Sequence, residues 1–160
     1  MTSVVQSGNI TPGHLATWVA PGTVGDGGPP LGQSETVLAR LLGANFNTTI
    51  DQAIPLPASG VTKFNLTRII VTNTTLSLTA AQGGFYPQPS KGGSAIVTAG
   101  QVYSALTAAA VLLNPTLTGA ANTTVYSATN LTAFSIYFSL SVAQGAACTA
   151  DIYLCGIVLG

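Results

Sequence analysis

From about residue 46 onward, apolar and polar side chains alternate with the period of two that is typical of β-strands. The clearest run is 134–142, where one set of side chains is apolar and the other carries hydroxyl groups. The two sets are Phe134, Ile136, Phe138, Leu140 and Val142 against Ser135, Tyr137, Ser139 and Ser141. This alternation predicts a half-buried antiparallel strand with a hydroxyl-lined outer face.

Two further long strands are predicted at 61–73 and 151–159, and both carry apolar side chains on both faces. Such a strand either lies at the centre of a protein or has its second face buried by a neighbouring subunit. The second alternative predicts an oligomer interface built from the additional apolar set: Ile69, Val71, Tyr153, Ile157 and Leu159.

Shorter strands are predicted between turn signals rich in glycine, proline and serine, one of which is Gln82-Gly83-Gly84. They lie near 49–56, 75–80, 94–98, 101–106, 111–118 and 123–128. Many short strands at this spacing are typical of an all-β, antiparallel β-sandwich, and their number favours a jelly-roll-like arrangement. The sequence therefore predicts a β-sandwich body over residues 46–160.

Residues 34–45 have the spacing of a short amphipathic helix that links this body to the N-terminal segment. Ser34 can cap the helix, Glu35 favours its N-terminal end, and Gly43 supplies a stop. The apolar stripe of this helix would consist of Val37, Leu38, Leu41 and Leu42.

Residues 1–33 differ from the rest of the chain because glycine and proline interrupt them too often for a regular element. Such a segment is either disordered or lies as an extended arm on another surface. Its single tryptophan, Trp18, either anchors the arm in a partner's pocket or packs on the chain's own body. The side chains expected to bind a partner are Val4, Val5, Ile10, Pro12, Leu15 and Trp18.

Composition changes this picture chiefly through charge. Charged residues make up 5% of the 160, four basic and four acidic, whereas an average soluble domain is about a quarter charged. The zero net charge predicts no binding to nucleic acid or to an anionic membrane, and it favours self-association. No apolar stretch approaches the roughly 20 residues of a membrane-spanning helix, and the first residues do not resemble a signal peptide.

The acidic, histidine and cysteine side chains form no pattern that indicates catalysis or metal binding. The acids Asp26, Glu35, Asp51 and Asp151 are scattered, and His14 is the only histidine. The sequence therefore predicts no enzyme, no catalytic residues, no metal site and no cofactor. Cys148 and Cys155 are expected to be buried, reduced thiols, although a hairpin between them could allow a disulfide.

Two parts of the chain resemble virion structural proteins of tailed bacteriophages. The opening "VVQSGNITPGHLATW", followed by "GDGG", is similar to the attachment arms of such proteins. The stretches "ANFNTTIDQAIPLP", "GGFYPQPSKGGSAIV" and "SLSVAQGAACTADIYLCGIVLG" resemble small β-sandwich proteins encoded near phage structural genes. Together they cover most of the chain.

The resemblance implies a non-enzymatic virion component with a jelly-roll-like body that forms a trimer and is assembled in the bacterial cytoplasm. As a capsid decoration, cement or head-fibre protein, it would bind the major capsid protein through its arm. The alternative is a tail-fibre or adhesin module that contacts host glycan through exposed tyrosines. The candidates for that role are Tyr86, Tyr103, Tyr126, Tyr137 and Tyr153.

Overall fold

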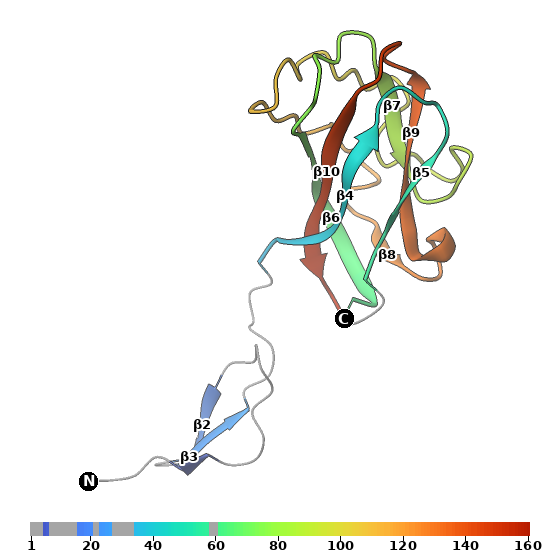
Figure 1. The fold of residues 1–160 in the computed structure, drawn as a ribbon. Helices are drawn as coiled ribbons and strands as arrows, with labels where there is room; N and C mark the ends of the chain where they lie inside the picture. The colour runs from blue at the N-terminus through green and yellow to red at the C-terminus, as the bar shows by residue number, and fades with distance from the viewer. Residues whose placement is uncertain (1–4, 7–15, 21–22, 27–33, 58–60) are drawn as a thin grey trace. The chain divides into compact units, whose positions relative to one another are not determined.

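The computed structural model describes residues 5–6, 16–20, 23–26, 34–57 and 61–160 (Figure 1). The chain divides into two compact units, Met1–Ser34 and Glu35–Gly160. The model describes no helix in either unit apart from one 3₁₀ turn, η1 (Thr132–Phe134). The fold is therefore all-β, as the sequence predicts.

The first unit contains three short strands: β1 (Val5–Gln6), β2 (Ala16–Ala20) and β3 (Thr23–Asp26). They form one small sheet in the order β1-β3-β2, with β1 parallel to β3 and β2 antiparallel to it. The structure thus describes short strands within the segment for which the sequence predicts no regular element. Backbone pairing between neighbouring short segments forms strands despite the glycines and prolines around them.

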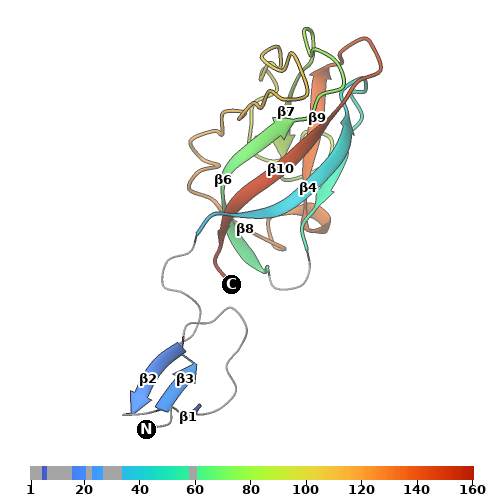
Figure 2. The ribbon, with the colours of Figure 1, turned by 60° about the vertical axis from the view of Figure 1, so that its left-hand side comes forward.

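The second unit consists of two antiparallel sheets. One has the order β4-β10-β6-β8 and the other β5-β9-β7, and every paired strand runs antiparallel to its neighbour. In Figure 2, β6, β10 and β4 run side by side, with β10 in the middle. The strands are β4 (Thr36–Asn45), β5 (Gln52–Pro55), β6 (Lys63–Thr72), β7 (Gln82–Tyr86), β8 (Val125–Ser127), β9 (Ser135–Val142) and β10 (Thr149–Val158).

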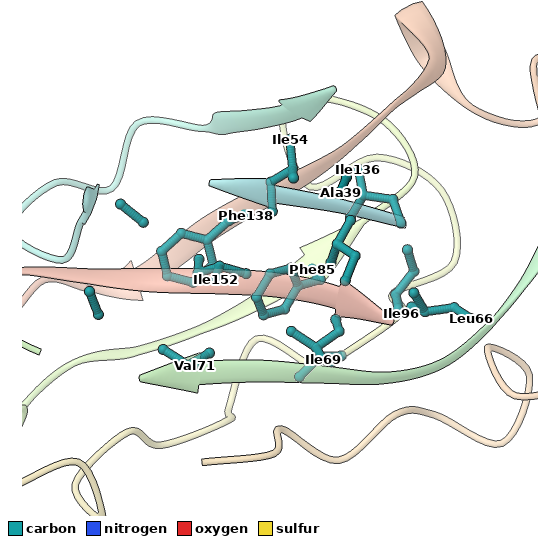
Figure 3. Packing of buried hydrophobic residues seen from close by; sticks show 14 of the residues in the cluster. Ala39, Ile54, Leu66, Ile69, Val71, Phe85, Ile96, Ile136, Phe138 and Ile152 are labelled. Carbon is teal, nitrogen blue, oxygen red and sulfur yellow. The ribbon is translucent and has the colours of Figure 1, made fainter. Parts of the chain in front are cut away.

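A single hydrophobic core receives side chains from both sheets (Figure 3). Phe138 on β9 lies at its centre, with its ring centroid 4.9 Å from that of Phe46, 5.1 Å from Phe85 and 6.0 Å from Tyr103. All four side chains are fully buried. The long strands predicted around residues 61–73, 134–142 and 151–159 are confirmed, because their apolar sets build this core.

The predicted helix at 34–45 is wrong, because residues 36–45 form strand β4. This strand pairs with β10 along most of its length, and Leu38, Ala39 and Ala44 enter the core. Pairing with a neighbouring strand and burial outweigh the modest helical preference of Leu, Ala and Arg. Gly43, predicted to stop the helix, instead takes a positive φ of 66° inside β4, where the ladder with β10 is irregular.

Strand β7 lies where the sequence predicts a turn, at Gln82-Gly83-Gly84. A Cβ atom on Gly84 would lie 2.2 Å from the Val97 carbonyl oxygen, so glycine allows a covering segment to cross β7 closely. The predicted strands at 75–80, 94–98, 101–106 and 111–118 are irregular, with isolated bridges at Val97, Val102 and Leu113. Those near 49–56 and 123–128 are confirmed in their central residues as β5 and β8.

The hydroxyl-bearing face of β9 is only partly exposed. Ser139 and Ser135 are buried, whereas Tyr137 is half-buried and Ser141 is exposed. The Ser141 hydroxyl donates to the Ala99 carbonyl at 2.7 Å, which places the segment after Val97 over this face. The hydroxyl-lined outer face of β9 is therefore covered in part: the segment after Val97 lies over Ser139 and Ser141, and Ser135 is buried as well.

Candidate assembly face

The outer face of the four-stranded sheet carries a set of apolar and long polar side chains in regular rows. Tyr153 on β10 stands opposite Arg40 on β4 and Ile70 on β6. The neighbouring core row, Leu154 with its partners Ala39 and Ile69, is buried. Because successive residues of a strand point to opposite faces, the Tyr153 row lies on the outer face.

The next outer row brings Cys155 opposite Val37 and Arg68. Farther along, Ile157 pairs with Asn65, beside the core pair of Val158 and Phe64. We define the assembly face as the outward residues of these rows: Val37, Arg40, Asn65, Arg68, Ile70, Tyr153, Cys155 and Ile157.

The predicted interface residues Ile69 and Val71 are not on this face, because both are fully buried in the core. A bulge in β6 explains the error. Cys155 pairs with Arg68 and Gly156 with Leu66, so Thr67 is an extra residue without an opposite partner. An extra residue shifts the alternation by one position, and Ile69 therefore faces the same side as Leu66.

The other predicted interface residues keep some solvent exposure. Tyr153 and Ile157 are half-buried on the assembly face, and Leu159, beyond the end of β10, is 43% exposed. Two exposed apolar side chains on β4 escaped the sequence prediction: Val37 at 55% and Leu42 at 54% exposed. The sequence places both on the apolar stripe of a helix, and only the pairing of β4 with β10 reveals their position.

One charged group of this face, the Arg68 guanidinium, has a local ionic partner. The Arg68 guanidinium lies 2.7 Å from the Glu35 carboxylate, which also accepts a hydrogen bond from the Thr67 hydroxyl. Beneath them, burial raises the pKa of the Cys155 thiol, the Glu35 charge adds to the rise, and Arg68 opposes it. An exposed ion pair of this kind stabilises the chain by less than about 1 kcal/mol, so its main effect is to orient the two side chains.

The remaining acids of the second unit lie in separate places. Asp151 accepts hydrogen bonds from the Gly43 amide at 2.8 Å and from the Asn73 side chain at 2.9 Å, which stabilises the irregular part of β4. Asp51 accepts from the Ser90 amide and supports the turn that follows β7. Within the described ranges, no group of His, Cys, Asp and Glu side chains could hold a metal ion.

The two cysteines are both buried, as predicted, and no disulfide joins them. The Cys148 thiol lies 3.4 Å from the Thr74 hydroxyl oxygen, at the base of a surface hollow lined partly by Asn45 and Asn47. These contacts are those of a thiol that is packed into the fold.

Three of the five candidate glycan-binding tyrosines are buried: Tyr86, Tyr103 and Tyr126. The Tyr103 hydroxyl donates to the Gly83 carbonyl at 3.3 Å, and Tyr137 donates to the Thr132 carbonyl at the same distance. Buried tyrosines usually satisfy their hydroxyl in this way. The structure therefore does not gather the five tyrosines on one surface.

The predicted partner-binding residues of the arm cannot be placed as side chains. Val4, Ile10, Pro12, Leu15 and the lone histidine, His14, lie outside the described residues. Val5 and Trp18 belong to the backbones of β1 and β2. In the part of the chain that is described, no helix is long and apolar enough to cross a membrane.

Comparison of the chain with models of protein families, with curated protein sequences and with solved structures found no match. The function therefore has to be argued from the fold and the surface of this chain alone.

Proposed function

We propose that this chain is a non-enzymatic virion structural protein of a tailed bacteriophage, of the capsid decoration, cement or head-fibre type. In this proposal, the second unit is a jelly-roll-like body that associates with copies of itself into a trimer. The first unit contains the arm, residues 1–33, that binds the major capsid protein.

The observation that carries this proposal is the nested order in which the strands of the body pair. The first strand pairs with the last, β4 with β10; the second pairs with the second last, β5 with β9; and β6 pairs with β8. Inside this nested set, the segment after β7 returns to it through isolated bridges of Val97 with Phe85 and of Val102 with Gln82. This nested order supports a jelly-roll-like body, because jelly rolls such as those of viral capsid domains are also built from two antiparallel sheets.

The surface of the body supports a role in assembly. Val37 and Leu42 expose more than half of their side-chain area on β4, and Ile70, Tyr153 and Ile157 are only half-buried. A second copy of the chain is the favoured occupant, because a chain with zero net charge presents no overall repulsion to itself. Burial of such residues is favourable by about 25 cal/mol for each Å² of apolar surface.

The arm supports the same proposal through its composition. Residues 1–33 are rich in glycine and proline, and they form a unit separate from the body. A segment of this kind gains most of its binding energy from a few anchoring side chains on a partner surface. Trp18 is the strongest candidate for such an anchor.

Cryo-electron microscopy of purified particles, combined with quantitative mass spectrometry, tests the function. We expect density for the body on the capsid surface, with a copy number comparable to that of the major capsid protein. A few copies at the tail would instead indicate the tail-fibre or adhesin alternative. Absence of the protein from particles would overturn the proposal altogether.

Self-association can be tested with the full chain in solution. Val37→Asp places a carboxylate in the assembly face at a position that is 55% exposed, and burial of an unpaired ion costs on the order of 3 kcal/mol or more. Sedimentation velocity should show a trimer for the unmodified chain and association at least about a hundredfold weaker for the variant. Ile50→Asp is the matched control, because Ile50 is 75% exposed in the loop after β4. Equal effects of the two substitutions would contradict the assignment of this face.

A further inference from the structure

A second surface feature of the body has no part in assembly. A cavity of about 240 Å³ lies between the segment that follows β7 and the segment that leads into and out of β8. Its lining includes Gln88, Ser94, Ala120, Tyr126 and Asn130. None of these residues belongs to the assembly face.

The walls of this cavity are tied together by hydrogen bonds, so the cavity is already formed in the unbound chain. The Thr118 amide donates to the Ile96 carbonyl, and the Thr118 hydroxyl donates to the Ala95 carbonyl, each at 2.9 Å. On the other side, the Asn130 side chain donates to the Val125 carbonyl at 2.8 Å. A preformed cavity loses little conformational entropy when a ligand enters.

The inner wall is aromatic. The Tyr126 ring stacks on Phe64, with ring centroids 5.5 Å apart and an angle of 25° between the planes. Burial raises the pKa of the Tyr126 phenol, so this group stays neutral at physiological pH. The wall therefore offers an apolar ring and an uncharged hydroxyl group.

The other lining groups are neutral as well. Alanine and proline side chains alternate with amide and hydroxyl groups, and no lysine, arginine, aspartate or glutamate lines the cavity. Gln88 and Ser94 both line the cavity and are exposed, so their amide and hydroxyl groups are accessible to a ligand. A charged ligand would lose its hydration here without gaining an ionic partner.

We propose that this cavity binds one neutral saccharide residue, either a free sugar or the end of a glycan. A sugar ring offers hydroxyl groups to Gln88 and Ser94, and C–H groups to the alanines and to the small part of the Tyr126 side chain that reaches the cavity. The lining fits the general form of a small-molecule site, which is mostly apolar with a few polar groups that orient the ligand. This binding goes beyond the proposed assembly role and does not depend on it.

Titration of the ¹⁵N-labelled full chain with glucose, galactose and N-acetylglucosamine, followed by NMR, tests the proposal. We expect saturable shifts of amide signals from residues 87–95 and 118–131, caused by at least one of the sugars. A ligand of this size that binds with ordinary efficiency per atom has a Kd on the order of 1 mM. Acetate and sulfate at equal concentration should produce no saturable shift at these amides.

Variants separate the cavity from other surfaces. Ser94→Leu fills the entrance at an exposed position and should weaken binding at least about tenfold, while Gln88→Ala should weaken it about threefold to tenfold. Asn114→Ala removes an exposed amide outside the cavity and should leave the affinity unchanged. The proposal is overturned if no sugar gives saturable shifts, if Ser94→Leu binds as well as the unmodified chain, or if the anions bind equally.

Discussion

Replacing Ser139 with alanine tests how closely the segment after β7 covers strand β9. Ser139 is 1% exposed, and within the described chain its hydroxyl group has no hydrogen-bond partner. Its backbone neighbour on β7 is Gly84, which the Val97 carbonyl approaches closely. The hydroxyl group is therefore enclosed by backbone without forming a bond.

The expected change in the free energy of unfolding follows from the cost of burying a polar group without a hydrogen-bond partner. A buried hydroxyl without a partner destabilises a fold by about 1–3 kcal/mol. Ser139→Ala removes this cost but leaves a small void, which offsets part of the gain. We expect the free energy of unfolding to rise by about 1 kcal/mol, which raises Tm by about 3 °C in a chain of this size.

Ser135→Ala is the matched control on the same strand. Ser135 is 4% exposed, but its hydroxyl donates to the Ala133 carbonyl at 3.0 Å. Loss of this bond should lower the free energy of unfolding by about 0.5–1.5 kcal/mol. The two variants thus remove the same atom from similar depth and are expected to change stability in opposite directions.

Urea denaturation of the full chain, followed by tyrosine fluorescence and circular dichroism, measures both effects. The dependence of the unfolding free energy on urea should be the same in all three proteins, so that the midpoints report stability directly. If Ser139→Ala lowers the midpoint as much as Ser135→Ala does, the Ser139 hydroxyl has a partner and the reasoning is refuted.

Three further predictions concern the same body. Gly84→Ala should lower the free energy of unfolding by about 1–3 kcal/mol or more, because the added Cβ meets backbone at 2.2 Å. Gly100→Ala, with open space around its Cβ, should change this free energy by less than about 0.5 kcal/mol. Equal urea midpoints of the two variants would contradict the close crossing at Gly84. Burial raises the pKa of Tyr103 above the value of about 10 that a tyrosine has in an unfolded chain. The contribution of this tyrosine to stability is therefore complete below about pH 10 and declines as the pH rises above it. A urea midpoint that does not decrease when the pH is raised from about 9 to about 11 would contradict this prediction. In a Cys148→Ala variant, Cys155 should react with a thiol reagent at about pH 8 at least tenfold more slowly in buffer than in urea. The reason is that the Cys155 thiol is buried and its pKa is raised in the folded chain. Equal rates would show that the thiol is accessible in the folded chain.

The three long strands could be predicted from the sequence because each carries apolar side chains at alternate positions over most of its length. Phe138 and its neighbours on β9 illustrate this, since residues 136, 138 and 140 are all fully buried. Strand β4 could not be predicted in the same way. Its apolar spacing suits a helix as well as a strand, and only β10 alongside it decides between them.

The candidate assembly face was predicted in part. Tyr153 and Ile157 lie on it, but the bulge at Thr67 replaces the predicted Ile69 with Ile70. A bulge depends on the pairing partner, and here the register between β6 and β10 shifts between Cys155 and Gly156. The cavity beside Tyr126 escaped prediction because its lining comes from segments that are distant in the sequence and irregular in structure.

By itself, the sequence determined the all-β class, the three long strands and the burial of both cysteines. These features follow from the local spacing of apolar residues and from composition, and both can be seen in the sequence without knowing which segments pack together. The tertiary structure decided that residues 36–45 form a strand, that Ile69 and Val71 point into the core, and that two serines of β9 are covered. Each of these depends on which strand or segment lies alongside, and that contact is set by backbone pairing between residues far apart in the chain.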